Sequence, residues 1–421
     1  MSRRATSPPG DARPGVRPPA EAHGIERLGW LDCEGRPPFK LALQVVGDRW
    51  YLFAGHLWHR GWSVIDVTDP TDPGLVTFIP GPPDTWTAQV QVADGLLLGG
   101  LSRIPERFGG RPGAAFEECA VVYDVRDPAA PRELSRIRLG GTGAHRSWWA
   151  GGSTAWLSAN ATGFRNYLLV GVDMRDPEHP TETTRWWLPG QRDDEPDPGP
   201  DSGVSLHGPA YVVGDQAYLS YGGAGMVILD VSDPTRPALL GRWSVSPPFR
   251  GGLFGAGVHT ARPLTSRGLA VVHGEAGPED CQGAPDFAGL VDVSDPRQPS
   301  LVSQFPRPRP SPGLPYRMYC DKGGRFGPHD SHLPQGNPWL DDREDRVHLT
   351  WFNAGLRVYD IADPREPREI ACYVPADPVR RHGPLPSGRL VTQSEVVLVD
   401  ARGVIYLTDK NDGLTLLRCT V

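Results

Sequence analysis

The stretch Met226–Pro237, MVILDVSDPTRP, decides the fold of this chain, because its pattern recurs along most of the sequence. An apolar run ends at Asp230, and the turn residues Asp233, Pro234 and Pro237 follow at a spacing that every copy keeps. Aspartate can accept hydrogen bonds from the backbone of a turn, and proline sets φ and removes a donor, so the phrase describes a strand that ends in a hairpin turn. The other copies are VIDVTDPTDP (64–73), VYDVRDPAAP (122–131), GVDMRDPEHP (171–180), LVDVSDPRQP (290–299) and VYDIADPREP (358–367).

Each copy marks one hairpin of a larger repeating unit. In the clearest unit two apolar segments, AYVVGDQAYLSY (210–221), precede the phrase and a third, ALLGRW (238–243), follows it. The unit therefore predicts four strands, and one such sheet cannot bury both of its faces alone. Four-stranded units at a spacing of roughly 50 to 70 residues indicate a radial stack of blades, an all-β propeller.

The phrases at 226–237 and 290–299 resemble those of the LVIVD-repeat propellers, and the resemblance extends from residue 38 to residue 421. It implies the fold and leaves the activity open, because that family is defined by its structure.

The C-terminal segment EVVLVDARGVIYLTDKNDGLTLLRC (395–419) supplies three strands without the DPxxP phrase and without a fourth strand. Near the other end, Ile25–Trp30 (IERLGW) has the pattern of the outer strand ALLGRW. We therefore predict a seven-bladed β-propeller of four-stranded blades whose last blade is closed by this N-terminal strand, which removes exposed ring edges. The predicted organisation is a disordered tail, 1–23, and a single propeller domain, 24–421.

Composition narrows the possible partners and compartments. The 51 glycines and 46 prolines suit short strands and tight turns, and a net charge of -7 without a basic cluster disfavours nucleic acid. No apolar run approaches the roughly 18 residues of a membrane span. The six cysteines contain no CxxC pair, and no apolar stretch follows Arg3 and Arg4, so we expect mostly reduced thiols and a cytoplasmic protein.

Aligning the repeats on their first hairpin places a histidine at the same position in four consecutive units: His145, His207, His259 and His329. The same column holds Lys40, Trp86 and Glu395 in the remaining units. The first residue of an innermost strand lies at the mouth of the central channel, so these imidazoles should converge on the axis. Imidazole binds iron, copper, zinc and nickel, and a carboxylate such as Glu395 can orient a ligand histidine from behind.

Alternatives remain open at this point. His332 could replace His329 as the fourth ligand, and a histidine copied along with its blade could simply line the channel. We expect second-shell or catalytic positions at Glu395, His273, Glu275 and Lys40, and a substrate pocket that includes Trp86, Trp148, Trp351 and His332. Long insertions lie mostly on the same face as the histidine column, as expected where loops build a site on a rigid scaffold.

Four histidines from separate blades are similar to the iron site of carotenoid cleavage oxygenases, and the DVSDP blades more weakly resemble selenium-binding protein and methanethiol oxidase propellers. These resemblances imply Fe(II) as cofactor, with copper as second choice. The predicted function is a metal-dependent oxidoreductase, a non-haem Fe(II) oxygenase or oxidase acting on a small organic substrate with O₂ as cosubstrate. The alternatives are a non-catalytic propeller that binds a ligand or protein, and a metal-dependent hydrolase or lactonase with Ca²⁺. GxSxG, HExxH and P-loop motifs are absent from the sequence.

Overall fold

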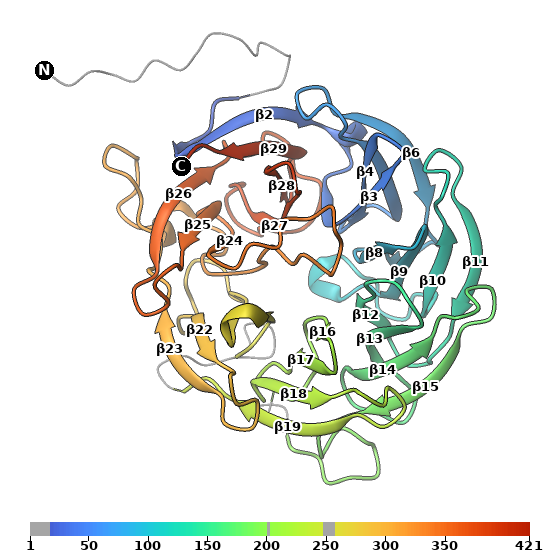
Figure 1. Ribbon diagram of the computed structural model, residues 1–421. Coiled ribbons are helices and arrows are strands. Elements are labelled where there is room, and N and C mark those ends of the chain that lie inside the picture. The colour runs from blue at the N-terminus through green and yellow to red at the C-terminus, as the bar shows by residue number, and fades with distance from the viewer. Residues whose placement is uncertain (1–16, 200–202, 247–256) are drawn as a thin grey trace, which may run out of the picture.

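The computed structural model describes residues 17–199, 203–246 and 257–421, so residues 1–16 of the predicted tail lie outside the described chain. Its strands form sheets arranged around a ring, and β2 (Ile25–Leu31), near the N-terminus, lies beside the last strand, β29 (Leu414–Cys419) (Figure 1). Helix is confined in the described residues to short 3₁₀ segments: η1 (Cys33–Gly35), η2 (Glu106–Phe108), η4 (Thr265–Arg267) and η5 (Tyr319–Lys322). The prediction of an all-β propeller arrangement is confirmed.

The sheets follow the repeats along the chain. The first contains β3 (Pro38–Val46), β4 (Arg49–His56), β5 (Gly61–Asp66) and β6 (Gly74–Pro80). A nine-stranded sheet contains β7 (Thr85–Trp86), β8 (Val90–Ala93), β9 (Leu96–Arg103), β10 (Cys119–Asp124), β11 (Arg132–Ile137), β12 (Gly143–Trp148), β13 (Thr154–Asn160), β14 (Leu168–Asp173) and β15 (Thr181–Trp186). Two further sheets contain β16 (Tyr211–Val213), β17 (Gln216–Ser220), β18 (Met226–Asp230) and β19 (Ala238–Trp243), then β20 (Thr260–Leu264), β21 (Leu269–His273), β22 (Ala288–Asp292) and β23 (Ser300–Gln304). The last two contain β24 (Arg346–Thr350), β25 (Leu356–Asp360), β26 (Arg368–Val374) and β1 (Glu21–His23), then β27 (Ser394–Val399), β28 (Val404–Asp409), β29 (Leu414–Cys419) and β2 (Ile25–Leu31).

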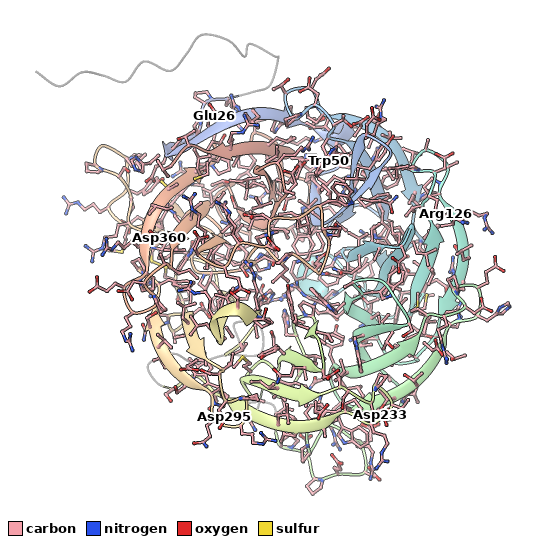
Figure 2. All side chains as sticks on the ribbon, viewed as in Figure 1. Glu26, Trp50, Arg126, Asp233, Asp295 and Asp360 are labelled. Carbon is pink, nitrogen blue, oxygen red and sulfur yellow. A yellow bond between two sulfur atoms is a disulfide. The ribbon has the colours of Figure 1, made fainter. Side chains whose placement is uncertain are left out.

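The DPxxP phrase forms the turn that its residues predict. Asp230 ends β18 and accepts a hydrogen bond from the Ser232 backbone N–H at 2.9 Å, and Asp233 accepts one from the Thr235 N–H at 3.0 Å. These carboxylates accept hydrogen bonds from backbone N–H groups that have no partner in the strand ladder, so the strand ends there. The turns lie toward the outside of the ring, where Figure 2 labels Asp233, Asp295 and Asp360.

The two ends of the chain complete each other's sheets. Strand β2 pairs antiparallel with β29, from Ile25 opposite Cys419 to Leu31 opposite Leu414, so the predicted closure by an N-terminal strand is confirmed. The boundary of the predicted tail is wrong by one strand, because Glu21 pairs with Val374 and β1 adds to β26. The reason is local: β26 presents an open edge, and three residues are enough to pair with it.

One sheet departs from the regular pattern at the axis. On the axial side of β24, the segment around Ser331 forms only one isolated bridge with this strand, between Ser331 and Leu349. The His329 N–H also donates a hydrogen bond to the Thr350 carbonyl oxygen at 3.0 Å. Pro328 and Pro334 flank this segment and supply no N–H, so a longer ladder cannot form.

Four of the six cysteines are thiols, in keeping with the expectation of mostly reduced cysteines, but the other two are paired. Cys281 and Cys320 form a disulfide across 39 residues, and Cys33, Cys119, Cys372 and Cys419 remain thiols. The spacing of the cysteines did not reveal the pair, because the ring brings together two loops that are distant in sequence. No helix of the described chain has the length and apolar character needed to cross a membrane.

Candidate metal centre

The innermost segments of four neighbouring units bring the histidine column together at the axis. Ring centroids are 5.0 Å apart between His145 and His207, 5.0 Å between His207 and His259, and 5.2 Å between His259 and His329. The alignment predicted this arrangement, whereas the role of these side chains as metal ligands stays a prediction.

Backbone irregularity turns the column residues toward the axis. In β12 the register passes from Ala144 opposite Ala159 to Arg146 opposite Ser158, which leaves His145 as an extra residue. A β-bulge of this kind re-aims a side chain, and here both His145 and Arg146 line the same cavity although strand neighbours normally point to opposite faces. The register also shifts near Lys40 in β3 and near Glu395 in β27.

Two of the rings are oriented from behind through Nδ1. His259 Nδ1 lies 2.8 Å from Thr260 Oγ1, and His329 Nδ1 lies 2.7 Å from the Glu395 carbonyl oxygen and 3.3 Å from its carboxylate. The Nε2 atom of His145 is buried and has no hydrogen-bond partner among the described residues. Burial lowers the pKa of His145, His259 and His329, so these rings are neutral, which is the form that binds a metal.

Glu275 lies directly beside two histidines of the column. Its Oε2 is 3.2 Å from His207 Nε2 and 3.8 Å from His259 Nε2, and one ligand atom from each of these three residues lies within 4.8 Å of the others. Burial opposes ionisation of Glu275, but the hydrogen bond from His207 and the charge of Arg325 outweigh it and hold the pKa of this carboxyl well below its usual range. The carboxylate is therefore available as a ligand or as the group that fixes His207.

Sequence reasoning missed three buried cations at this site: Arg146, Arg325 and Lys410. Arg146 Nη2 lies 2.8 Å from His259 Nε2, Arg325 Nη1 lies 2.8 Å from Glu275 Oε1, and Lys410 Nζ lies 2.7 Å from Glu395 Oε1. Lys410 lies one residue after β28 (Val404–Asp409) and Glu275 lies two residues after β21 (Leu269–His273), so both come just after the second strand of their units, and that placement could have been read from the sequence. The β-bulge that admits Arg146 has no such signal.

A cavity of about 600 Å³ opens above the histidines. Its apolar wall comes from Trp86 and Phe108 together with Leu57, Phe39 and Tyr167. Residues of two long insertions form part of its rim, among them Arg103, Pro105 and Arg107 of one and Gly190, Gln191 and Asp197 of the other. Trp86, His145, His207, His329, Glu275 and Glu395 line this cavity, whereas His259, the remaining predicted ligand, does not. The roles of these residues in binding a metal or a substrate stay predictions.

Two tryptophans predicted for the pocket lie elsewhere. Trp148 is buried against Tyr211, with ring centroids 4.1 Å apart, and Trp351 is buried near Phe326 at 6.0 Å. Both belong to the hydrophobic core between sheets, and neither lines the cavity.

His332 is neither a ligand nor a pocket residue. Its Nε2 lies 2.6 Å from the Asp341 carbonyl and its Nδ1 accepts a hydrogen bond from the Val399 N–H at 3.1 Å, so both ring nitrogens are occupied. The choice between His329 and His332 is therefore resolved in favour of His329 as the member of the column.

His273 and Lys40 lie behind the column. His273 contacts Ser331 Oγ at 3.1 Å through Nε2, and its ring is stacked 6.0 Å from His259. Lys40 forms a buried ion pair with Asp330 at 2.6 Å. Neither lines the cavity, so both support the site without facing a ligand.

Comparisons with known proteins support the fold. Residues 210–245 match the LVIVD repeat model, and no curated protein sequence matches the chain. Among solved structures, a chain of "Crystal Structure of Mitotic Checkpoint Complex" is 11% identical with a TM-score of 0.53, covering 99% of this chain and 98% of that one. "Structure of U3-55K" is 9% identical with a TM-score of 0.56, covering 94% and 98%. At these identities the likeness concerns the fold alone.

Proposed function

We propose that this protein is a metal-dependent oxidoreductase, a non-haem Fe(II) oxygenase or oxidase whose ion is held by His145, His207, His259 and His329. The spacing of neighbouring rings in the column carries the proposal. Among the described residues, only His207, His259 and Glu275 already bring one ligand atom each within 4.8 Å of the others, so His145 and His329 would have to move closer to bind the same ion. With metal–nitrogen bonds of about 2.1 Å and a ring centre about 1.1 Å beyond the nitrogen, two imidazoles at 90–110° on one ion have centres about 4.5–5.3 Å apart. The observed separations of 5.0 to 5.2 Å fall within that range.

We propose that the sheets around the four histidines form seven blades. The nine-stranded sheet then divides into β8–β11 and β12–β15, which are joined by a single register pair, Gly143 with Ser102, while the short β7 pairs with β9. Four consecutive blades would each contribute one histidine, an arrangement similar to that of the carotenoid cleavage oxygenases.

Carboxylates complete the proposed centre. Glu395 would orient His329 through Nδ1, and Glu275 would hold His207 or provide a further oxygen ligand. When bound, the ion would supply redox chemistry and open coordination positions. The chain itself would exclude water with Trp86 and Phe108 and position a small organic substrate in the cavity beside the rings.

One contact sets a condition on metal binding. The Arg146 guanidinium occupies His259 Nε2 at 2.8 Å, so an ion can bind there only if the guanidinium moves away. The same contact favours a second candidate, a metal-free propeller that binds a ligand through its cationic cavity. The two differ in whether metal content depends on the histidines.

Metal analysis of the untagged protein tests the proposal. We expect one ion per chain by mass spectrometry, with an electron paramagnetic resonance spectrum that separates iron from copper. The double variant His207→Ala/His259→Ala should lose it, and His179→Ala, an exposed histidine on a turn, should keep it. Absence of stoichiometric metal, or unchanged content in the double variant, would rule out the metal centre and leave the ligand-binding alternative.

A further inference from the structure

We propose that the cavity beside the histidines binds an organic monocarboxylate, and that Arg146 receives its carboxylate group. That this anion is the substrate rests on the proposed function, whereas its binding does not. The proposal stands on a buried cation without a matching anion and on the shape of the space beside it.

The charges around the axis do not balance. Three buried cations are each neutralised by a carboxylate partner: Lys40 by Asp330, Arg325 by Glu275, and Lys410 by Glu395. Arg146 is a fourth buried cation, only 4% exposed. Its Nη1 lies 3.7 Å from an Asp330 oxygen that already accepts from Lys40.

No other described residue supplies the missing negative charge. The Nε and Nη1 atoms of Arg146 have no hydrogen-bond acceptor among the described residues. Asp286 could supply a negative charge near Glu275. Burial and the Glu275 charge, however, raise the pKa of Asp286 to about 8, so its carboxyl group is largely protonated at neutral pH. A buried, uncompensated cation costs several kcal/mol, which favours a ligand that brings an anion.

The cavity indicates the rest of the ligand. A volume of about 600 Å³ suits a small organic molecule, and Trp86 and Phe108 present an apolar wall to its body. A guanidinium fork matches the planar carboxylate with two parallel hydrogen bonds. One carboxylate balances the excess charge of Arg146 beside the histidines, and Arg103, Arg107 and Arg165 also line the cavity. The parallel N–H pair of a guanidinium includes Nη2, which contacts His259. A metal ion at His259 would displace Arg146 from the ring and free Nη2 to complete the fork with Nε or Nη1.

The test compares cinnamate with cinnamamide, which have the same shape and differ in charge, by calorimetry on chelator-treated and metal-loaded full-length protein at pH 7.5. We expect cinnamate to bind at least about tenfold more tightly in both forms. Arg146→Met should abolish the preference and Arg146→Lys should keep part of it. The control Arg185→Met changes an arginine of β15 that pairs with Glu182 on the outer surface, and should behave as wild type.

Equal binding of acid and amide, binding of neither, tighter binding of phenyl phosphate, or a preference retained in folded Arg146→Met each overturns the proposal. If Arg146→Met fails to fold by near-ultraviolet circular dichroism, the wild-type ratio and Arg146→Lys decide. Metal content in the same preparations separates the two proposals. Protein without metal that still prefers cinnamate overturns only the oxidoreductase, and metal-containing protein without the preference overturns only the carboxylate site.

Discussion

Arg146 places Nη2 2.8 Å from Nε2 of His259, so a guanidinium lies where a metal ion would bind. Both side chains are buried, and they reach each other across the axis from different sheets. This contact makes the cation and any bound ion competitors for one nitrogen.

Removing the competitor should strengthen metal binding. Arg146→Met vacates His259 Nε2 and removes a positive charge near the ion, so we expect an Fe(II) or Zn²⁺ dissociation constant lower by about tenfold or more. Competition with a chromophoric chelator measures it. Weaker binding in this variant would show that Arg146 supports the ion.

Glu275→Gln should weaken both metal affinity and stability. The amide leaves Arg325 without its carboxylate at 2.8 Å and loosens His207. We expect a metal affinity lower by about 10- to 100-fold and a loss of about 3–5 kcal/mol in the free energy of unfolding. Urea unfolding of the metal-free protein and chelator competition measure the two effects. Glu366→Gln, in an exposed pair with Arg368, is the matched control and should change neither.

Buried histidines away from the site should make stability fall in mild acid. Burial lowers the pKa of His56 to about 3 and that of His348 to about 4, so both stay neutral in the folded protein when the unfolded chain takes up protons. Stability is therefore full above the unfolded pKa of about 6.5 and falls below it, by about 1.4 kcal/mol per pH unit for each residue. Urea midpoints at pH 7 and pH 5 measure this loss. His348→Gln should flatten the dependence, and His179→Gln at an exposed turn should not.

The closing strand should contribute measurably to stability. Ile25 is buried between the last sheets, so Ile25→Ala should lower the free energy of unfolding by about 2–5 kcal/mol. The exposed neighbour Glu26→Ala should have little effect. Thermal unfolding measures both. An unchanged midpoint for Ile25→Ala would show that the ring is stable without closure by its N-terminal strand.

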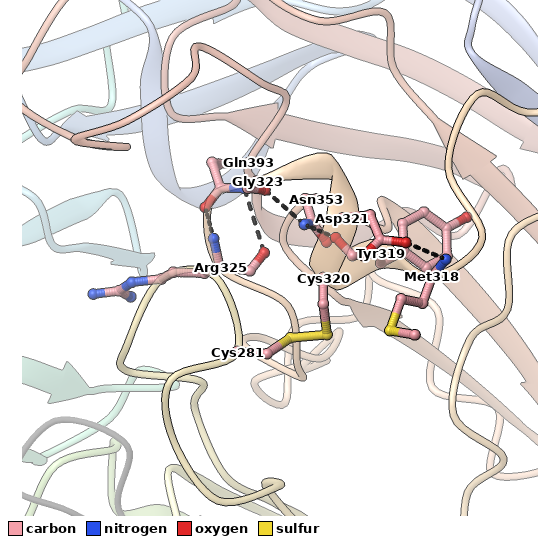
Figure 3. The surroundings of a disulfide bond; sticks show 9 residues. All are labelled: Cys281, Met318, Tyr319, Cys320, Asp321, Gly323, Arg325, Asn353 and Gln393. Atoms are coloured by element: carbon pink, nitrogen blue, oxygen red, sulfur yellow. Dashed lines mark hydrogen bonds between the residues drawn. A yellow bond between two sulfur atoms is a disulfide. The ribbon is translucent and has the colours of Figure 1, made fainter.

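The disulfide should stabilise the loops that carry the ion pair of Glu275 and Arg325. Cys320 lies in η5, beside the Gly323–Arg325 segment that bonds to Gln393 (Figure 3). Cys281 lies in the same loop as Glu275, between β21 and β22. Closing 39 residues predicts a loss of about 3–4 kcal/mol in Cys281→Ser/Cys320→Ser. Thiol titration of denatured, unreduced protein should find four thiols, and the control variant Cys33→Ser, which lacks one of them, should show three. A count of six would show that the bond is absent from the protein as purified.

The sequence alone determined the repeat, the strand-ending turns, the pairing of the two ends and the histidine column. These depend on local chemistry: aspartate and proline stop a strand wherever they occur, and copies of one phrase place equivalent residues at equivalent depths. The pairing of Ile25–Leu31 with β29 followed because an incomplete unit leaves an open edge that a matching strand can fill.

Only the tertiary structure decided what surrounds the column. The β-bulge at His145 brings Arg146 into the cavity, the core between sheets takes Trp148 and Trp351, and the ring brings Cys281 to Cys320. Each depends on register or on contacts between distant segments, and a shift of one residue reverses the direction of a side chain. The sequence thus placed the histidines at the axis, and the fold decided that a buried arginine meets them there.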